Sequence, residues 1–161
     1  MRIPKIYLET TIFNYNFAED APEKQKDNIT LFEDIKNGLF EPYTSTIVVD
    51  ELLKSSEPKK SKMLDLISKY DISVLPATDE IDELAKEYVK SSIIPEKYTD
   101  DARHIACATI YNIDIIVSWN FKHIVKRKTI IMTEQINLMQ GYKNVEIYSP
   151  SEVVSNDENW R

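Results

Sequence analysis

The chain has 161 residues, of which 42% are hydrophobic and 29% charged, and its formal net charge is -7 at pH 7. This length suits one domain that buries roughly two-thirds of its unfolded surface, and the longest apolar runs are too short to span a membrane. The start of the chain lacks the basic, apolar and small-residue regions of a secretory signal. Together with the single cysteine, Cys107, this predicts a cytoplasmic protein.

Glycine and cysteine usage exclude several classes of nucleotide and metal site. The two glycines, Gly38 and Gly141, lie far apart, so the chain lacks the Gly-rich loop of P-loop enzymes and dinucleotide dehydrogenases. One cysteine cannot build a cysteine-rich zinc site. The acidic charge argues against a nucleic-acid partner, because counterion release rewards basic surfaces, but residues 122–128 hold four cations and no acid. Net charge alone therefore does not exclude a nucleic acid.

The first half of the chain predicts strands and helices in alternation. A strand is expected over residues 3–8, and Asn28 can cap a helix whose apolar residues recur at helical spacing up to the region of Gly38. A short strand is expected over residues 43–45. Residues 47–53 are ambiguous, because their β-branched side chains favour a strand whereas their spacing fits a helical face. A helix at residues 63–67 and a strand at residues 72–75 follow.

The second half continues the alternation. Residues 81–89 have the clearest amphipathic helix pattern in the chain, and further elements are expected as a helix over 101–111, a strand over 113–117, a helix over 133–140 and a strand over 145–148. Ser149, Pro150 and Glu152 form a capping box that opens a short helix. Strands separated by helices predict one α/β domain with a central, mostly parallel sheet flanked by helices in a three-layer α/β/α arrangement. This domain is placed at residues 1–154, with a short tail at 155–161.

Several polar residues adjoin the ends of the predicted strands or open a predicted helix. They are Glu9, Thr10, Asp50, Glu51, Asp100, Asp101, Asn112, Asp114, Ser118 and Asn120. In parallel sheets ligands bind outside the carboxyl ends of the strands, and carboxylates that converge there repel one another unless a proton or a cation intervenes. Mg²⁺ prefers oxygen ligands, so the pattern favours metal-assisted phosphodiester hydrolysis. Ordinary roles stay open for each acid, such as the helix-dipole role of Asp100 and Asp101.

Two further features are candidates for supporting roles. His104 follows Asp101 by three residues, so it could orient that carboxylate, touch RNA or have no functional role. The stretch from Trp119 to Lys128 interleaves aromatic residues with cations, which is what stacking and phosphate contacts with single-stranded RNA require. Its candidate RNA-binding residues are Trp119, Lys122, Lys126 and Arg127. The alternative interpretation places the aromatic side chains in the core and the cations in solvent.

Four segments in order resemble the motifs of the PIN-domain family. They are Leu8-Glu9-Thr10-Thr11, the segment from Ser45 to Leu52, the segment from Asp101 to Ala108, and Val117-Ser118-Trp119-Asn120-Phe121. The resemblance extends over about residues 3–154 and is closest to single-domain VapC-type toxins. It implies a PIN-like α/β fold, Mg²⁺- or Mn²⁺-dependent ribonuclease activity on single-stranded RNA, a possible antitoxin protein partner and a homodimer.

The same resemblance implies roles for individual residues. Glu9, Glu51 and Asp101 take the places of the first three family acids, which hold the metal ions, and Asn120 takes the place of the fourth. Catalysis would use these four positions, with a metal-bound water attacking the scissile phosphate. Thr10 and Ser118 take the neighbouring hydroxyl positions.

Two departures from the family pattern define the alternative hypotheses. The first family acid is usually Asp, whereas this chain has Glu9, which is one methylene longer. The fourth acid is replaced by the neutral Asn120, a loss that Asp100 could compensate. The alternatives are a catalytically weakened PIN-like module that binds RNA or a protein partner, and a metal-dependent phosphatase or DNase that uses the same residues.

Overall fold

The computed structural model describes residues 2–155, which fold around a five-stranded parallel sheet with the strand order β3-β2-β1-β4-β5. The strands are β1 (Lys5–Leu8), β2 (Glu41–Ser45), β3 (Ser73–Leu75), β4 (Ile115–Val117) and β5 (Glu146–Tyr148). The central strand β1 pairs with β2 and β4, so that Tyr7 lies opposite Tyr43 and Ile116. Each strand lies where the sequence predicts one, and the parallel pairing is confirmed.

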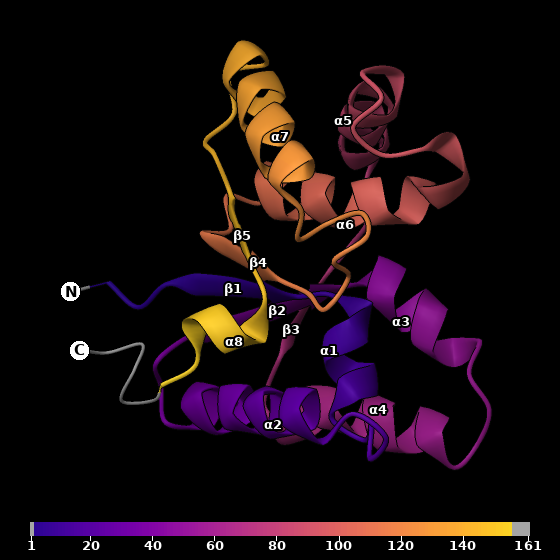
Figure 1. The fold of residues 1–161 in the computed structure, drawn as a ribbon, viewed down its shortest axis with the longest axis vertical. Coiled ribbons are helices and arrows are strands. Elements are labelled where there is room, and N and C mark those ends of the chain that lie inside the picture. The colour runs from indigo at the N-terminus through magenta and orange to yellow at the C-terminus, as the bar shows by residue number, and fades with distance from the viewer. Residues whose placement is uncertain (1, 156–161) are drawn as a thin grey trace.

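Helices connect the strands and cover both faces of the sheet. They are α1 (Thr10–Tyr15), α2 (Pro22–Lys36), α3 (Thr46–Leu53), α4 (Lys59–Lys69), α5 (Asp79–Lys90), α6 (Thr99–Ile110), α7 (Arg127–Met139), α8 (Pro150–Val153) and a 3-10 turn at Glu96–Tyr98. Figure 1 shows the sheet nearly edge-on, with α1, α2, α4 and α8 below it and α5, α6 and α7 above it. The predicted three-layer α/β/α fold is therefore confirmed. None of the helices formed by residues 2–155 combines the length and the hydropathy that a membrane-spanning helix needs.

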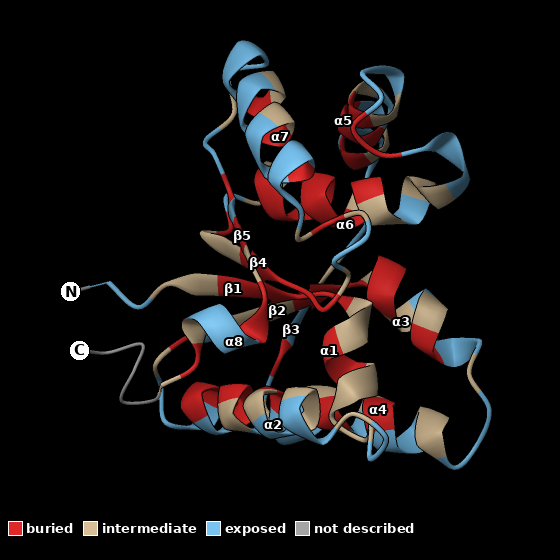
Figure 2. Cartoon of the chain, in the orientation of Figure 1, coloured by how far each residue is buried: buried red, intermediate tan, exposed pale blue. Residues whose placement is uncertain are grey.

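The core lies between the sheet and the two helical layers. Ile6, Tyr7 and Leu8 of the central strand are fully buried, as expected for a parallel strand covered on both faces. Figure 2 shows the buried residues along the sheet and on the helix sides that face it. Each fully buried Leu or Ile contributes about 1.5–3 kcal/mol to folding. Burial of the strands therefore fixes the sheet edge on which the polar residues meet.

Helix α3 resolves the ambiguous segment in favour of a helix. Ser45 caps it, and its side chain accepts a hydrogen bond from the backbone N–H of Val48 at 3.3 Å. Ile47, Val48 and Leu52 form its buried face, so tertiary packing outweighs the β propensity of the branched residues. Glu51 is therefore presented by the second turn of a helix and not by the end of a strand.

The predicted cap at Asn28 is wrong, because α2 begins at Pro22 and Asn28 lies inside it. Pro22 is the start signal, since proline is favoured at the first helical position. Asn28 is fully buried and acts as a link: its Nδ2 donates to the carbonyl of Ile12 at 2.8 Å, and its Oδ1 accepts from Nε1 of Trp119 at 2.9 Å. It therefore joins α1, α2 and the loop after β4.

Helix α7 begins at Arg127, six residues before the predicted start at Thr133. Its buried face is polar, with Thr129, Thr133 and Asn137 turned inward, whereas Leu138 and Met139 are 78% and 84% exposed. Hydrophobic periodicity predicts a helix only when the inward face is apolar. In the first two turns of α7 the buried residues are threonines and the isoleucines are exposed. The sequence therefore shows no apolar stripe there that would have indicated the helix start.

The C-terminal capping box is confirmed. The N–H of Ser149 donates to Oε1 of Glu152 at 3.0 Å, and Pro150 occupies the first turn of α8. The predicted tail at residues 155–161 lies outside the described residues apart from Ser155, whose backbone N–H donates to Oδ2 of Asp34 at 2.8 Å.

Candidate active site

The carboxyl edge of the sheet brings together residues from four elements. Glu9 directly follows β1 and Ser118 directly follows β4. Glu51 reaches the same edge from α3, and Asp101 reaches it from the first turn of α6. The strands are parallel and in register, so their carboxyl ends deliver these residues to one place.

Glu9 is the N-cap of α1 and is 3% exposed. Its Oε1 accepts hydrogen bonds from the Thr11 hydroxyl at 2.6 Å, the Ser118 hydroxyl at 2.6 Å and the Thr11 backbone N–H at 3.2 Å. Within residues 2–155 these three bonds all reach Oε1 and none reaches Oε2. The carboxylate is therefore fixed through one oxygen, and the other remains available to a ligand.

Glu51 is held in the same way by different partners. Its Oε1 accepts hydrogen bonds from the Thr10 hydroxyl at 3.0 Å and from Nε2 of His104 at 2.5 Å. Partial burial acts to raise the pKa of Glu51, but the hydrogen bond and the charge of His104, together with Thr10, outweigh burial and lower it. Glu51 is therefore ionised at neutral pH with a defined orientation.

His104 is fully buried and belongs to a chain of hydrogen bonds that begins in the core. Its Nδ1 is hydrogen-bonded to the Tyr7 hydroxyl at 2.8 Å, and that hydroxyl is hydrogen-bonded to Oγ of Ser45 at 2.7 Å. Burial acts to lower the pKa of His104, but the bond to Glu51 and the charge of Glu9 raise it overall. The series of hydrogen bonds from Ser45 through Tyr7 and His104 thus fixes Glu51 from the side of the core. His104 therefore orients Glu51 and not Asp101.

Tyr7→Phe should lower the stability by about 1–3 kcal/mol and the Tm by about 3–10 °C, because it leaves Nδ1 of His104 buried without its partner. Glu51 should keep its position, since its bonds to His104 and Thr10 remain. Thermal unfolding measures the loss of stability. Tyr43→Phe is the matched control, because its hydroxyl bonds the exposed Glu41 and its loss should change stability by less than about 0.5 kcal/mol. Equal stability of the two variants would refute a stabilising role for the buried hydrogen bonds of Tyr7.

Asp101 is the acid most affected by its neighbours. Burial and the negative charge of Glu9 raise its pKa to about 6, and Glu51 adds to this, whereas His104 and a hydrogen bond from Asn120 act in the opposite direction. A carboxyl group behaves in this way when it is buried and negative charges lie near it. Glu9, Glu51 and Asp101 therefore form one electrostatically coupled group.

Asn120 lies between Asp101 and the loop that follows β4. Its backbone N–H donates to the Ser118 hydroxyl at 2.9 Å, and its Oδ1 accepts from the backbone N–H of His123 at 3.0 Å. Its side chain also hydrogen-bonds Asp101. Asn120 thus stabilises the conformation of the loop and is a neutral neighbour of Asp101.

Two acids from the sequence prediction lie away from this group. Asp100 is exposed and forms an ion pair with Nη1 of Arg103 at 3.2 Å, so the expected compensation for Asn120 is not supported by the structure. Asp114 lies at the opposite, amino edge of the sheet, where Arg2 and Lys143 bind it and hold its pKa far below its ordinary value. Asp114 stabilises the position of the N-terminal segment through these bonds. A carboxylate at the start of β4 cannot reach the carboxyl edge, so Asp114 is not part of the site.

The predicted RNA-binding residues divide into buried and exposed side chains. Trp119 is 5% exposed and donates its Nε1–H to Asn28, so its ring cannot receive an RNA base as a free stacking face, and this prediction is corrected. Lys122, Lys126 and Arg127 are exposed. The solvent-exposed aromatic residue of this loop is Phe121, which is 47% exposed.

A sequence profile of the PIN domain matches residues 6–124, which is most of the chain. The chain belongs to the PIN-domain family. PIN domains are generally nucleases and typically use divalent metals.

Among solved structures, the fold is similar to a chain from the crystal structure of VapBC2 from Rickettsia felis bound to a DNA fragment from its promoter. The TM-score is 0.55 and the sequence identity 19%, and the match covers 89% of this chain and 97% of that one. At this identity the likeness concerns the fold alone. No curated protein matches the sequence significantly.

Three residues of this PIN domain were not predicted as part of the site. Thr11 fixes Glu9, whereas Tyr7 and Ser45 support His104. A tyrosine inside an apolar strand is the one available signal, since a buried hydroxyl needs a partner. The partner itself lies 97 residues away, and no local pattern identifies it.

The donor set of the PIN domain fits a hard divalent cation. It consists of carboxylates, with Glu9 and Glu51 each held through Oε1, and oxygen ligands of this kind suit Mg²⁺ and Mn²⁺. Burial, followed by the negative charge of Glu9, raises the pKa of Asp101. In the described part of the chain no three His, Cys, Asp or Glu side chains are already gathered at metal-binding distances.

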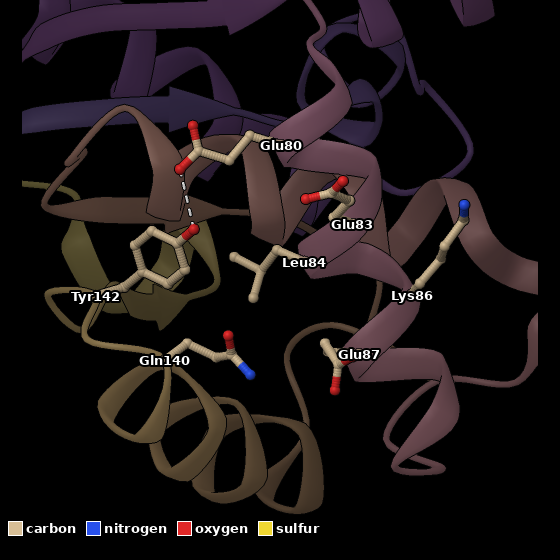
Figure 3. Close-up of a pocket in the computed structure, with 7 residues that line it drawn as sticks. All are labelled: Glu80, Glu83, Leu84, Lys86, Glu87, Gln140 and Tyr142. Carbon is tan, nitrogen blue, oxygen red and sulfur yellow. Dashed lines mark hydrogen bonds between the residues drawn. The ribbon is translucent and has the colours of Figure 1, made fainter.

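A separate cavity of about 320 Å³ lies between α5 and the end of α7. It is lined by Glu80, Glu83, Leu84, Lys86, Glu87, Gln140 and Tyr142. Figure 3 shows Tyr142 turned toward Glu80, to which its hydroxyl donates at 3.0 Å. None of the predicted site residues lines this cavity, so it is not the active site that the family motifs indicate.

Proposed function

We propose that this PIN domain is an endoribonuclease that depends on Mg²⁺ or Mn²⁺ and cleaves single-stranded RNA, acting as the toxin of a type II toxin-antitoxin pair. The observation that supports the proposal is that Glu9, Glu51 and Asp101 come from three elements to the carboxyl edge of the sheet, where burial and the charge of Glu9 raise the pKa of Asp101. Family membership supports the nuclease class.

The chain's own residues prepare this site before any ligand binds. Thr11 and Ser118 hold Glu9, and Thr10 and His104 hold Glu51, so that both carboxylates are oriented by donors on their inner side. The side chain of Asn120 lowers the pKa of Asp101. Glu9, Glu51 and Asp101 would bind the cation, which supplies an activated water and neutralises charge on the phosphate.

Metal removal is the direct test. The purified chain should cleave unpaired RNA with Mg²⁺ or Mn²⁺, lose at least about 100-fold in rate when the metal is chelated, and recover when Mn²⁺ is returned in excess. Cleavage is followed by gel electrophoresis of end-labelled RNA, with single-stranded DNA of the same sequence as the comparison. Cleavage that persists in chelator would contradict the proposal, and equal cleavage of the DNA would replace RNase with a broader nuclease.

A second candidate function is a catalytically weakened module that binds a protein or RNA. The replacement of the fourth acid by Asn120 favours it, and so does the unusual surface of α7, where Leu138 and Met139 are exposed while polar residues are buried. Isolated exposed apolar residues are common, but adjacent ones at a helix end suit a protein contact. An antitoxin, a homodimer and a cytoplasmic location remain part of the proposal.

A further inference from the structure

Two groups of aromatic and basic side chains lie beside the candidate active site. The Trp119 cluster consists of Tyr15, Lys24, Trp119 and Phe121, and the Tyr98 cluster consists of Lys97, Tyr98, Lys122 and His123. The loop from Trp119 to His123 contributes to both clusters, with Asn120 between them. The side chains of the clusters do not hold the carboxylates, so they need another explanation.

The Trp119 cluster is a group of three neighbouring aromatic rings with one lysine close to all of them. The Trp119 ring lies 5.6 Å from the ring of Tyr15 and 6.3 Å from that of Phe121, measured between centroids. Nζ of Lys24 lies 5.4 to 5.9 Å from all three ring centroids. Trp119 is buried and Phe121 is 47% exposed. Trp119 therefore forms the rigid base, and Phe121 forms the face open to a ligand.

The Tyr98 cluster also combines aromatic rings with lysines, and it has two rings and two lysines. The rings of Tyr98 and His123 stack with centroids 4.1 Å apart and an interplanar angle of 33°. Nζ of Lys97 lies 5.8 Å and Nζ of Lys122 lies 5.7 Å from the Tyr98 centroid. Burial, Lys122 and Lys126 lower the pKa of His123, so its imidazole is a neutral aromatic ring at pH 7.

Both clusters adjoin the three carboxylates. Thr11 donates to Glu9 and accepts from the backbone N–H of Trp119 at 2.8 Å, which joins the Trp119 cluster to Glu9. Tyr98 directly precedes the helix that carries Asp101. In Figure 1, α1 and α2, which carry Tyr15 and Lys24, lie on one face of the sheet and α6 lies on the other. A strand that crosses the carboxylates would therefore meet both clusters.

Among residues 2–155, the lysines of the clusters form no ion pair with a carboxylate. The chain has 27 acids and 20 lysines and arginines, yet the ion pairs formed among residues 2–155 use Arg2, Arg103, His104 and Lys143. Lys24, Lys97 and Lys122 lie over aromatic rings instead. Their charge is available to phosphate groups, which three neighbouring carboxylates would otherwise repel.

We propose that the two clusters are stacking platforms for unpaired RNA bases next to the phosphate that is cleaved, with their lysines contacting the flanking phosphates. The proposal rests on the proposed function for the position of that phosphate. Every base has a face that stacks on an aromatic ring, so such platforms tolerate many sequences. Paired bases are hidden inside a duplex, so the platforms select single strands.

Binding by full-length protein that carries Asp101→Asn tests the platforms without cleavage. The probe is a fluorescent oligouridylate of about 12 nucleotides, and the comparison ligand is inorganic polyphosphate, which has the charge but no bases. Phe121→Ala and Tyr98→Leu should each weaken RNA binding by about 5- to 100-fold and leave polyphosphate binding nearly unchanged. Phe121→Tyr keeps a ring and should restore RNA binding. Lys122→Ala should weaken the binding of both ligands.

Matched controls lie at the amino edge of the sheet. Tyr142→Ala removes a partly exposed aromatic ring there, and Lys69→Ala removes a lysine that lies 5.4 Å over the Tyr70 ring; both should bind RNA like the reference. The platforms are refuted if Phe121→Ala and Tyr98→Leu bind RNA as the reference does, if RNA and polyphosphate binding fall equally, or if duplex RNA binds as tightly as the single strand. Platform-dependent binding by a chain that cuts no RNA would instead remove only the nuclease proposal.

Discussion

Asp101→Asn should reduce RNA cleavage by at least about 100-fold and, at pH 7, raise the Tm by about 2–4 °C. The two effects have one cause, because the carboxylate that would bind the cation is surrounded by like charge. Burial and Glu9 raise the pKa of Asp101 to about 6. The amide keeps a carbonyl oxygen but carries no charge, so it relieves this repulsion and binds a cation poorly.

The pH dependence of stability follows from the same shift. The pKa of Asp101 is about 6 in the folded protein against an ordinary value of 3.8, so between these values the folded state holds the proton more tightly than the unfolded state. Stability therefore falls as pH rises through this window, and the full cost is present above about pH 6. Partial exposure of the side chain screens the repulsion, which leaves a cost of about 1 kcal/mol.

Asp100→Asn is the neighbouring control, since Asp100 is exposed and pairs with Arg103. It should leave the cleavage rate within about twofold and change stability by less than about 0.5 kcal/mol. Thermal unfolding at several pH values and cleavage assays with Mn²⁺ measure both variants. An Asp101→Asn protein that still cleaves, or that is less stable than the unmodified chain at pH 7, would contradict the coupled-carboxylate site.

The parts of this fold that the sequence predicts are those whose signal is local. The apolar run before Glu9 and the amphipathic pattern from Ile81 to Val89 each identify their own element. The alternation of strands and helices then requires parallel pairing, which brings Glu9 and Ser118 to one edge. Glu51 reaches that edge although its segment is a helix, because Ser45 turns the chain and caps α3 there.

The parts that the sequence does not predict depend on contacts between distant segments. The polar inward face of α7 includes Asn137, whose Oδ1 accepts from the hydroxyl of Tyr88 on α5, 49 residues away. Asn28 inside α2 is explained by the indole of Trp119, 91 residues later. In both cases a polar residue at a helical position is satisfied by tertiary structure, so local preferences such as capping give the wrong interpretation.

Family motifs locate the acids but do not describe their mutual effect. Glu9 has an extra methylene compared with the aspartate that is usual in the family motif, and its side chain takes part in capping a helix. The longer side chain folds back as the N-cap of α1, where Thr11 and Ser118 fix Oε1. The substitution of Asp by Glu is thus accommodated by local hydrogen bonds, and the remaining departure is the missing fourth charge at Asn120.

Glu9→Gln should abolish cleavage and, in the metal-free protein, lower the pKa of Asp101 below its value of about 6. Oε1 of glutamine can accept the same hydrogen bonds from Thr11 and Ser118, so the fold of α1 is retained. The lost negative charge makes the ionised form of Asp101 less unfavourable, and a lower pKa follows. Carbon-detected NMR titration of the Asp101 carboxyl group measures the shift directly.

Two controls separate charge from packing in this experiment. Glu9→Asp keeps the charge and shortens the side chain, so the pKa of Asp101 should stay raised even if the caps on α1 weaken. Glu134→Gln removes an exposed charge on α7 and should leave the pKa of Asp101 unchanged. If Glu9→Gln also leaves it unchanged, burial and Glu51 raise the pKa of Asp101 without a contribution from Glu9. Glu9 and Asp101 would then not share a cation, because two carboxylates close enough to bind one ion must sense each other's charge.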